Sequence, residues 1–253
     1  MSSSSRCWLP VLLYHRVAPR PSEDPWNNFV SPETFESHLR WLRSWRYQSI
    51  PLGAVADAMT GGPRLPRRAI AITFDDGYLD TRQFAWPLLR RYGYGATVFL
   101  VSDAIGGDSA FDAGSGYEPA PMLGWDQIRM MALDGIEFGS HTSSHPETLV
   151  DLDGATLRRE LMSSRRTIEA ALDQPVDLFA YPHSKHDGRV EAAVAEAGYR
   201  LACGGVGTRF DPFCVSRVEA PQAPGPAVNL VAAWRRLKWR ARATLPVFTR
   251  HAA

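Results

Sequence analysis

Two clusters of polar residues have the types and spacing to do chemistry together. The first is Thr73-Phe74-Asp75-Asp76-Gly77, which follows small and apolar residues and therefore stands where a buried strand ends. Two close carboxylates interact, so the pair could supply a base and attract a cation. Gly77 permits the sharp turn that brings both side chains to one site. The alternative is an Asp-Asp-Gly turn that caps the following helix.

The second cluster runs from Ser140 to His145, again at the end of an apolar strand. His141 and His145 are four residues apart and would share one face if this segment were a helical turn. Two imidazoles and one carboxylate from the first cluster would suit a divalent metal and leave positions open for water and substrate. Taken alone, a histidine pair at this spacing is more often a solvated surface feature.

The elements that must position these clusters alternate between short apolar runs and longer amphipathic stretches. This alternation is typical of βα units around a mostly parallel sheet. The expected strands cover residues 11–14, 70–74, 96–101, 137–140, 178–181, 200–203 and 214–218. A first helix is expected after the Ser31-Pro32 cap, followed by helices over 81–92, 125–133, 155–172 and 189–197. No repeat or break in composition marks a linker, which predicts a single domain.

The composition narrows the class of protein. The 253 residues are 45% hydrophobic and 22% charged, which is typical of globular domains. With 28 Lys and Arg against 27 Asp and Glu, the net charge of +1 argues against nucleic acid as a partner. The three cysteines form no CxxC pair or disulfide pattern, so a reducing compartment is expected. The apolar run 8–14 is interrupted by Pro10, which predicts a strand instead of a signal peptide and hence a cytoplasmic location.

Together the motifs resemble those of the NodB-like polysaccharide deacetylases, carbohydrate esterase family 4. The resemblance extends over nearly the whole chain and rests on Leu13-Tyr14-His15-Arg16-Val17, Thr73-Phe74-Asp75-Asp76-Gly77, Ser140-His141-Thr142-Ser143-Ser144-His145-Pro146 and Phe179-Ala180-Tyr181-Pro182. It implies an α/β fold, a distorted TIM-like (β/α)7 barrel in a single domain. We expect an N-terminal tail over 1–9, the deacetylase domain over 10–225, and a basic amphipathic helix and tail over 226–253.

The resemblance also implies roles for individual residues. The metal ligands would be Asp76, His141 and His145, and the divalent metal would most often be Zn²⁺. Asp75 would be the general base that deprotonates water. The substrate would meet Tyr181, Pro182 and His183, with a backbone N–H near Tyr181 or His183 facing the oxyanion. The aromatic residues in or beside loops are candidates for stacking on a sugar: Trp26, Phe111, Tyr117 and Trp125.

The chain departs from the family pattern at three places. Ala180 stands where many members carry an arginine that orients the base, and His183 and Ser184 replace an aromatic residue and a glycine. The Leu-x-His motif of the C-terminal region is missing there. Leu13-Tyr14-His15 supplies it at the N-terminus, as in circularly permuted members, so His15 is the expected general acid.

The expected function is removal of an N-acetyl or other N-acyl group from an amino-sugar substrate, such as a cytoplasmic or lipid-linked glycan precursor. Two alternatives stay open: the same site acting on a cyclic imide or ureide, and an inactive carbohydrate-binding barrel. Residues 230–245 combine an apolar stripe with five basic residues. This segment would either pack on the barrel or make peripheral contact with a membrane.

Overall fold

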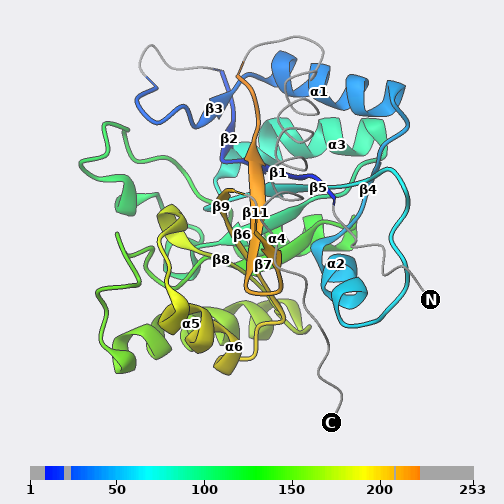
Figure 1. Cartoon of the computed structure of the whole chain (residues 1–253). Helices are drawn as coiled ribbons and strands as arrows, with labels where there is room; N and C mark the ends of the chain where they lie inside the picture. Colours follow the sequence, from blue (N-terminus) through cyan, green and yellow to red (C-terminus); the bar gives the residue numbers. More distant parts are fainter. Residues whose placement is uncertain (1–8, 20–23, 208, 223–253) are drawn as a thin grey trace, which may run out of the picture.

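The computed structural model describes residues 9–19, 24–207 and 209–222. Within these ranges seven parallel strands form a closed barrel (Figure 1). The strand order is β1 (Val11–Tyr14), β5 (Ala69–Phe74), β6 (Thr97–Leu100), β7 (Glu137–Ser140), β8 (Leu178–Ala180), β9 (Leu201–Val206) and β11 (Cys214–Glu219). Because β1 pairs with both β5 and β11, the N-terminal strand closes the barrel. The predicted single-domain (β/α)7 architecture is confirmed.

Four very short strands accompany the barrel. β2 (Arg16–Val17) pairs with β3 (Phe29–Val30) in a separate two-stranded sheet. β4 (Gln48–Ser49) pairs with the start of β5, and β10 (Phe210–Asp211) forms an antiparallel hairpin with β11. Two residues are too few to produce a periodic pattern, so the sequence did not predict these strands.

Helices cover the outside of the barrel (Figure 1). They are α1 (Pro32–Ser44), α2 (Leu52–Met59), α3 (Trp86–Tyr92), α4 (Trp125–Leu133), α5 (Gly154–Leu172) and α6 (Gly188–Glu196). The predicted Ser31 cap is confirmed, since its Oγ accepts a hydrogen bond from the backbone N–H of Thr34. The helix expected over 81–92 begins instead with a π-helical turn, η1 (Thr81–Ala85), and continues as α3.

The sequence did not predict α2, because its cap comes from a distant strand. Pro51 precedes α2 and offers no side-chain hydrogen bond. The carboxylate of Glu137, in β7, accepts hydrogen bonds from the backbone N–H groups of Leu52 and Gly53 at 2.8 and 3.0 Å. A cap supplied by tertiary structure leaves no local signal in the sequence.

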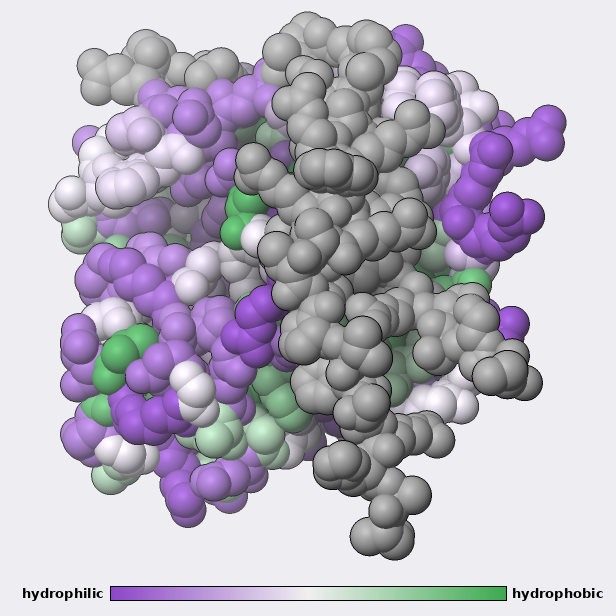
Figure 2. All heavy atoms as spheres, viewed as in Figure 1, coloured by the Kyte–Doolittle hydropathy of each residue, from purple (hydrophilic) through white to green (hydrophobic). Residues whose placement is uncertain are grey.

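Alternation along the strands separates the core into two layers. In β5, Ile70, Ile72 and Phe74 pack outward against the helices, in the cluster that includes Phe35 of α1. The alternate alanines of β5 belong to the second, inner cluster, with Val11, Leu178 and Val215. The face in Figure 2 is mostly hydrophilic where described residues form it. Positions 73 and 75 continue the inward series of β5, which directs their side chains into the barrel.

The predictions about the two ends of the chain and about membranes can be compared with the structure only in part. No helix among the described residues is both long and apolar enough to cross a bilayer. Residues 1–8 of the expected tail and the expected helix over 226–253 lie outside the described residues. The two interpretations of that helix therefore stay predictions.

His38 makes stability depend on pH. This α1 residue is fully buried, its Nδ1 lies 3.0 Å from the Tyr14 hydroxyl, and burial lowers its pKa from 6.5 to about 4. Between these values the unfolded chain binds the extra proton, so stability is fully present above pH 6.5 and falls as the pH falls towards 4. The full shift corresponds to about 3 kcal/mol. Urea unfolding at pH 7 and pH 4.5 should show a smaller loss in His38→Gln than in the wild type; an equal loss would contradict this.

Candidate active site

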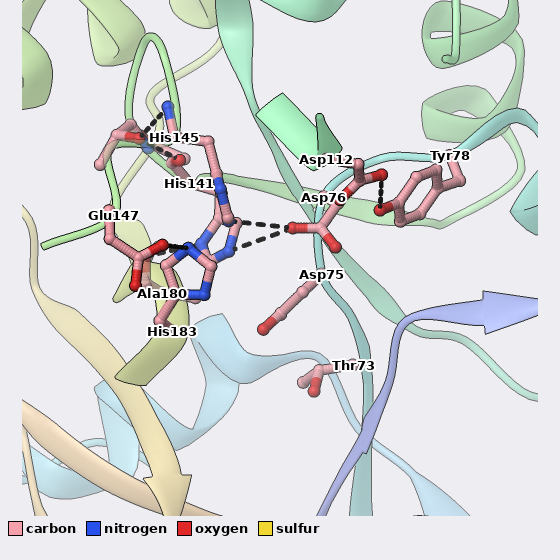
Figure 3. A network of polar contacts seen from close by, with 12 residues as sticks. Thr73, Asp75, Asp76, Tyr78, Asp112, His141, His145, Glu147, Ala180 and His183 are labelled. Carbon is pink, nitrogen blue, oxygen red and sulfur yellow. Dashed lines mark hydrogen bonds and ion pairs between the residues drawn. The ribbon is translucent and has the colours of Figure 1, made fainter. Parts of the chain in front are cut away.

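Asp75 and Asp76 extend from β5 at the mouth of the barrel (Figure 3). The backbone N–H of Asp75 donates to the carbonyl of Tyr14 at 3.0 Å, which continues the β1–β5 pairing by one residue. The chain then turns sharply, with φ of 72° at Asp76 and 88° at Gly77. A Cβ at residue 77 would lie 2.8 Å from a methyl carbon of Leu100, so glycine is required for space as well as conformation. The predicted turn is confirmed, and both carboxylates are buried.

His141 and His145 follow β7, but the expected helical turn between them is wrong. The segment is irregular, and Thr142 and His145 have positive φ values of 72° and 58°. Glu160 of α5 holds this turn by accepting hydrogen bonds from the backbone N–H groups of Ser143 and Ser144, both at 2.9 Å. A turn with positive φ values, and not the spacing of a helix, therefore brings the two histidines together. Both imidazoles face Asp76 (Figure 3).

Asp76, His141 and His145 form a set that fits a divalent metal. Oδ1 of Asp76 lies 3.3 Å from Nε2 of His141 and 3.4 Å from Nε2 of His145. This oxygen is buried and has no hydrogen-bond partner within the described part of the chain. Nδ1 of His141 lies 2.8 Å from the carbonyl oxygen of Ala180, an arrangement that leaves Nε2 free to bind a metal. Two imidazole nitrogens and one carboxylate oxygen are a ligand set typical of catalytic sites for a divalent metal.

Replacing His141 with Ala is expected to lower the metal content by one equivalent per chain, because water cannot replace a protein ligand of this site at equal affinity. Elemental analysis after dialysis measures this. His183→Ala is the matched control, since its ring lies 4.8 Å from that of His145 but outside the ligand set. Unchanged metal content in His141→Ala would refute the assignment.

Arg217 is a site residue that the sequence analysis did not identify. It lies in β11 and is buried, and its guanidinium donates to both oxygens of Asp75 at 2.6 and 2.7 Å. A further hydrogen bond from Nε to the carbonyl of Gly204 fixes its plane. Ala180 occupies the position where many family members carry the arginine for the base, and here β11 provides it instead. The available signal was an arginine within an apolar strand pattern, two residues from Val215, which faces the barrel interior.

The charges around Asp75 keep it ionised. Burial alone would raise the pKa of this carboxyl, but the charge and hydrogen bonds of Arg217, together with the charge of His141, lower the pKa below its ordinary value. The charge of His15 also lowers it. His15 directly follows β1 and is partly exposed, so the expected general acid lies within electrostatic reach of the expected base.

Two of the expected substrate residues, Pro182 and His183, lie at the same mouth. Pro182 and His183 belong to the short 3-10 turn η4 (Pro182–Ser184), and Nε2 of His183 lies 3.5 Å from a carboxylate oxygen of Glu147. The backbone N–H of Tyr181 donates to the carbonyl of Cys203, so this expected oxyanion donor is already used by the sheet. Trp125, the first residue of α4, is partly buried and packs against the main core.

The loop between β6 and α4 forms a wall beside the candidate metal site. The ring of Phe111, in η3 (Ala110–Asp112), lies 4.6 Å from that of His145. Tyr78 holds the loop by donating its hydroxyl hydrogen to Asp112 at 2.8 Å (Figure 3). The indole N–H of Trp26 donates to the carbonyl of Ser115 at 2.7 Å. These hydrogen bonds hold the loop beside the candidate metal site.

The fold and the site define an α/β barrel protein with a candidate Asp-His-His metal centre beside a buried, arginine-paired carboxylate. The sequence model of the polysaccharide deacetylase family matches residues 62–202, and the chain belongs to this family.

Relatives with similar sequences agree with this membership. The chain is 28% identical over 218 residues to YxkH of Bacillus subtilis, assigned to the polysaccharide deacetylases; the match covers 85% of this chain and 69% of that one. It is 23% identical to the poly-beta-1,6-N-acetyl-D-glucosamine N-deacetylase of Staphylococcus aureus, with coverage of 69% of this chain and 60% of that enzyme. The chain thus spans less than two thirds of the staphylococcal enzyme.

Among solved structures, the deacetylase PplD of Streptococcus pyogenes in complex with acetate has a similar fold. Its TM-score is 0.77 at 22% identity, covering 89% of this chain and 97% of that one. IcaB from Ammonifex degensii gives a TM-score of 0.73 at 24% identity, with coverage of 89% and 96%. At these identities the likeness establishes the fold.

Proposed function

We propose that this protein is a metal-dependent N-deacetylase of an N-acetylglucosamine-containing glycan. The observation that carries the proposal is the placement of Asp75, buried and paired with Arg217, directly beside the Asp76, His141 and His145 set. Metal-assisted hydrolysis of an amide needs one ionised base next to a Lewis acid. The family membership and the name of the staphylococcal relative support an N-acetylated glucosamine polymer or its precursor as the substrate.

Each residue of the site has its own role in the proposed reaction. Asp76, His141 and His145 would hold a divalent metal, Zn²⁺ in our proposal, which would supply Lewis-acid chemistry at the acetamide carbonyl and at the attacking water. Asp75 accepts the proton of the attacking water, and Arg217 holds its carboxylate ionised and oriented. His15 donates a proton to the leaving amine, so that acetate and the free amino sugar are released. The rings of Phe111 and His183 lie 4.6 and 4.8 Å from that of His145, and the proposal places the sugar beside them.

His15→Ala is expected to lower deacetylation of an amide about 10²-fold or more while leaving the metal content unchanged, because the leaving amine loses its proton donor. An acetyl ester with a good leaving group needs little protonation. Its hydrolysis should therefore fall much less. Comparing kcat for the two substrates measures the role, and equal losses on amide and ester would rule out a proton donor at His15.

The proposed activity is tested by acetate release from purified, zinc-loaded protein. The substrates are β-1,6-linked and β-1,4-linked N-acetylglucosamine oligomers, with a cyclic imide as the substrate of the alternative reaction. We expect acetate from at least one oligomer and no opening of the imide, and strongly reduced acetate release in an Asp75→Asn control. Imide opening without acetate release would favour the imidase alternative. Oligomer binding without turnover would favour the inactive carbohydrate-binding barrel.

A further inference from the structure

A second group of metal-binding side chains lies between α6 and the β10–β11 hairpin. His186 precedes α6, Glu191 lies in its first turn, and Cys214 begins β11. Their ligand atoms lie within 4.8 Å of one another. The side chains of His186 and Glu191 are 12% and 18% exposed, and Cys214 is buried. The proposed deacetylation uses none of these three residues, which we term the Cys214 cluster.

The imidazole of His186 is oriented as a metal ligand. Its Nδ1 lies 3.0 Å from Oε1 of Glu191, and its Nε2 lies 3.8 Å from Sγ of Cys214. A carboxylate at Nδ1 holds the proton there and directs the Nε2 lone pair towards the sulfur. Bonds of about 2.3 Å to sulfur and about 2.0 Å to nitrogen, at a tetrahedral angle, separate two ligand atoms by about 3.5 Å. The observed separation is therefore close to that of two ligands of one ion.

Gly204 leaves space beside both ligand atoms. A Cβ at this position of β9 would lie 3.3 Å from Sγ of Cys214 and 3.3 Å from Nε2 of His186. Gly204 does not belong to the glycines with positive φ, so its backbone conformation does not require a glycine. The missing side chain instead keeps open the position next to the sulfur and the nitrogen.

The charges of the surroundings suit a divalent cation. Arg209 pairs with Glu191 at 2.6 Å and with Asp211 at 3.0 Å. With Cys214 as a thiolate, the three negative charges of Cys214, Glu191 and Asp211 and the positive charge of Arg209 sum to −2. This net charge matches that of a divalent ion. A catalytic cysteine is a poorer interpretation, because burial raises the pKa of the free Cys214 thiol to about 11.

We propose that Cys214 and His186 bind a second metal ion, of the kind that prefers thiolate and imidazole ligands, with Zn²⁺ as the representative. Glu191 orients the imidazole, and water completes the coordination. The ion would join the start of α6 to the strand that carries Arg217. Because His186 stacks on Tyr181 with ring centroids 4.1 Å apart, it would also support the wall of the active site from behind.

Cobalt substitution distinguishes this site from the Asp76 site, which contains no sulfur ligand. The full chain, carrying Cys7→Ser, is loaded with Co²⁺ and examined by elemental analysis and near-ultraviolet absorption. We expect two equivalents per chain and a thiolate-to-cobalt charge-transfer band. Cys214→Ser and Gly204→Ala should each lose one equivalent and the band. His141→Ala should lose one equivalent and keep the band, and Cys203→Ala, which removes the other buried thiol, should keep both.

Two results would overturn the second site. One is a single equivalent of Co²⁺ in the parent chain with no charge-transfer band. The other is a band that persists in Cys214→Ser or disappears in Cys203→Ala. Neither readout involves a sugar substrate, so the result is independent of the proposed deacetylase activity. Circular dichroism of each variant shows whether a lost equivalent comes from the site or from unfolding.

Discussion

Replacing Asp75 with Asn is expected to lower the turnover of the amide substrate by about 10²- to 10⁴-fold, the usual effect of removing a general base. The amide cannot accept the proton of the attacking water. Because Asn does not titrate, the acidic limb of the pH profile, which reports ionisation of Asp75 in the wild type, should also disappear. The measurement is kcat/KM for acetate release between pH 5 and pH 9, with the metal content determined in parallel.

The control for this variant is Asp112→Asn, the same chemical change in the loop at a carboxyl that accepts a hydrogen bond from Tyr78. It should retain most of the turnover. Since Asp75→Asn leaves Arg217 buried without its charge partner, the folded fraction must be checked by circular dichroism. Near-complete activity in folded, metal-loaded Asp75→Asn would show that Asp75 has only a structural role.

Arg217→Met is expected to reduce both stability and activity. Removing one member of a buried ion pair leaves the other charge uncompensated and costs about 3–5 kcal/mol of unfolding free energy. Arg217 also lowers the pKa of Asp75. Activity needs the ionised carboxylate and is lost as the pH falls through this pKa, so a raised pKa shifts the acidic limb to higher pH. Urea unfolding measures the first effect, and the pH profile of kcat/KM measures the second.

Two further variants isolate the role of the ion pair between Arg217 and Asp75. In Arg217→Met/Asp75→Asn both charges are absent, so part of the lost stability should return. Arg200→Met removes an arginine that is 42% exposed and pairs with Asp57 and Asp177, and it should cost no more than about 1 kcal/mol. If Arg217→Met kept the acidic limb of the wild type, Arg217 would not control the ionisation of Asp75.

The sequence by itself determined the alternating βα architecture and the candidate metal set. Apolar runs of four to six residues predicted the barrel strands, and the helix over Trp125–Leu133 has the predicted bounds. Asp75, Asp76 and His141 could be placed at strand ends because Asp75 and His141 directly follow such runs and Asp76 comes one residue later. Parallel strands bring their carboxyl ends to one mouth of a barrel, so local patterns were sufficient to unite these residues.

The tertiary structure decided which distant groups act on these site residues. Arg217 and Asp75 are 142 positions apart and meet only because β1 closes the barrel between β5 and β11. The cap of α2 by Glu137 and the approach of Cys214 to His186 are likewise contacts between segments that are far apart in the sequence, although β1 takes no part in them. Periodicity records which face of an element is buried, but it does not record which element lies opposite that face. Closure of the barrel supplies that information, and with it the charge that keeps the base ionised.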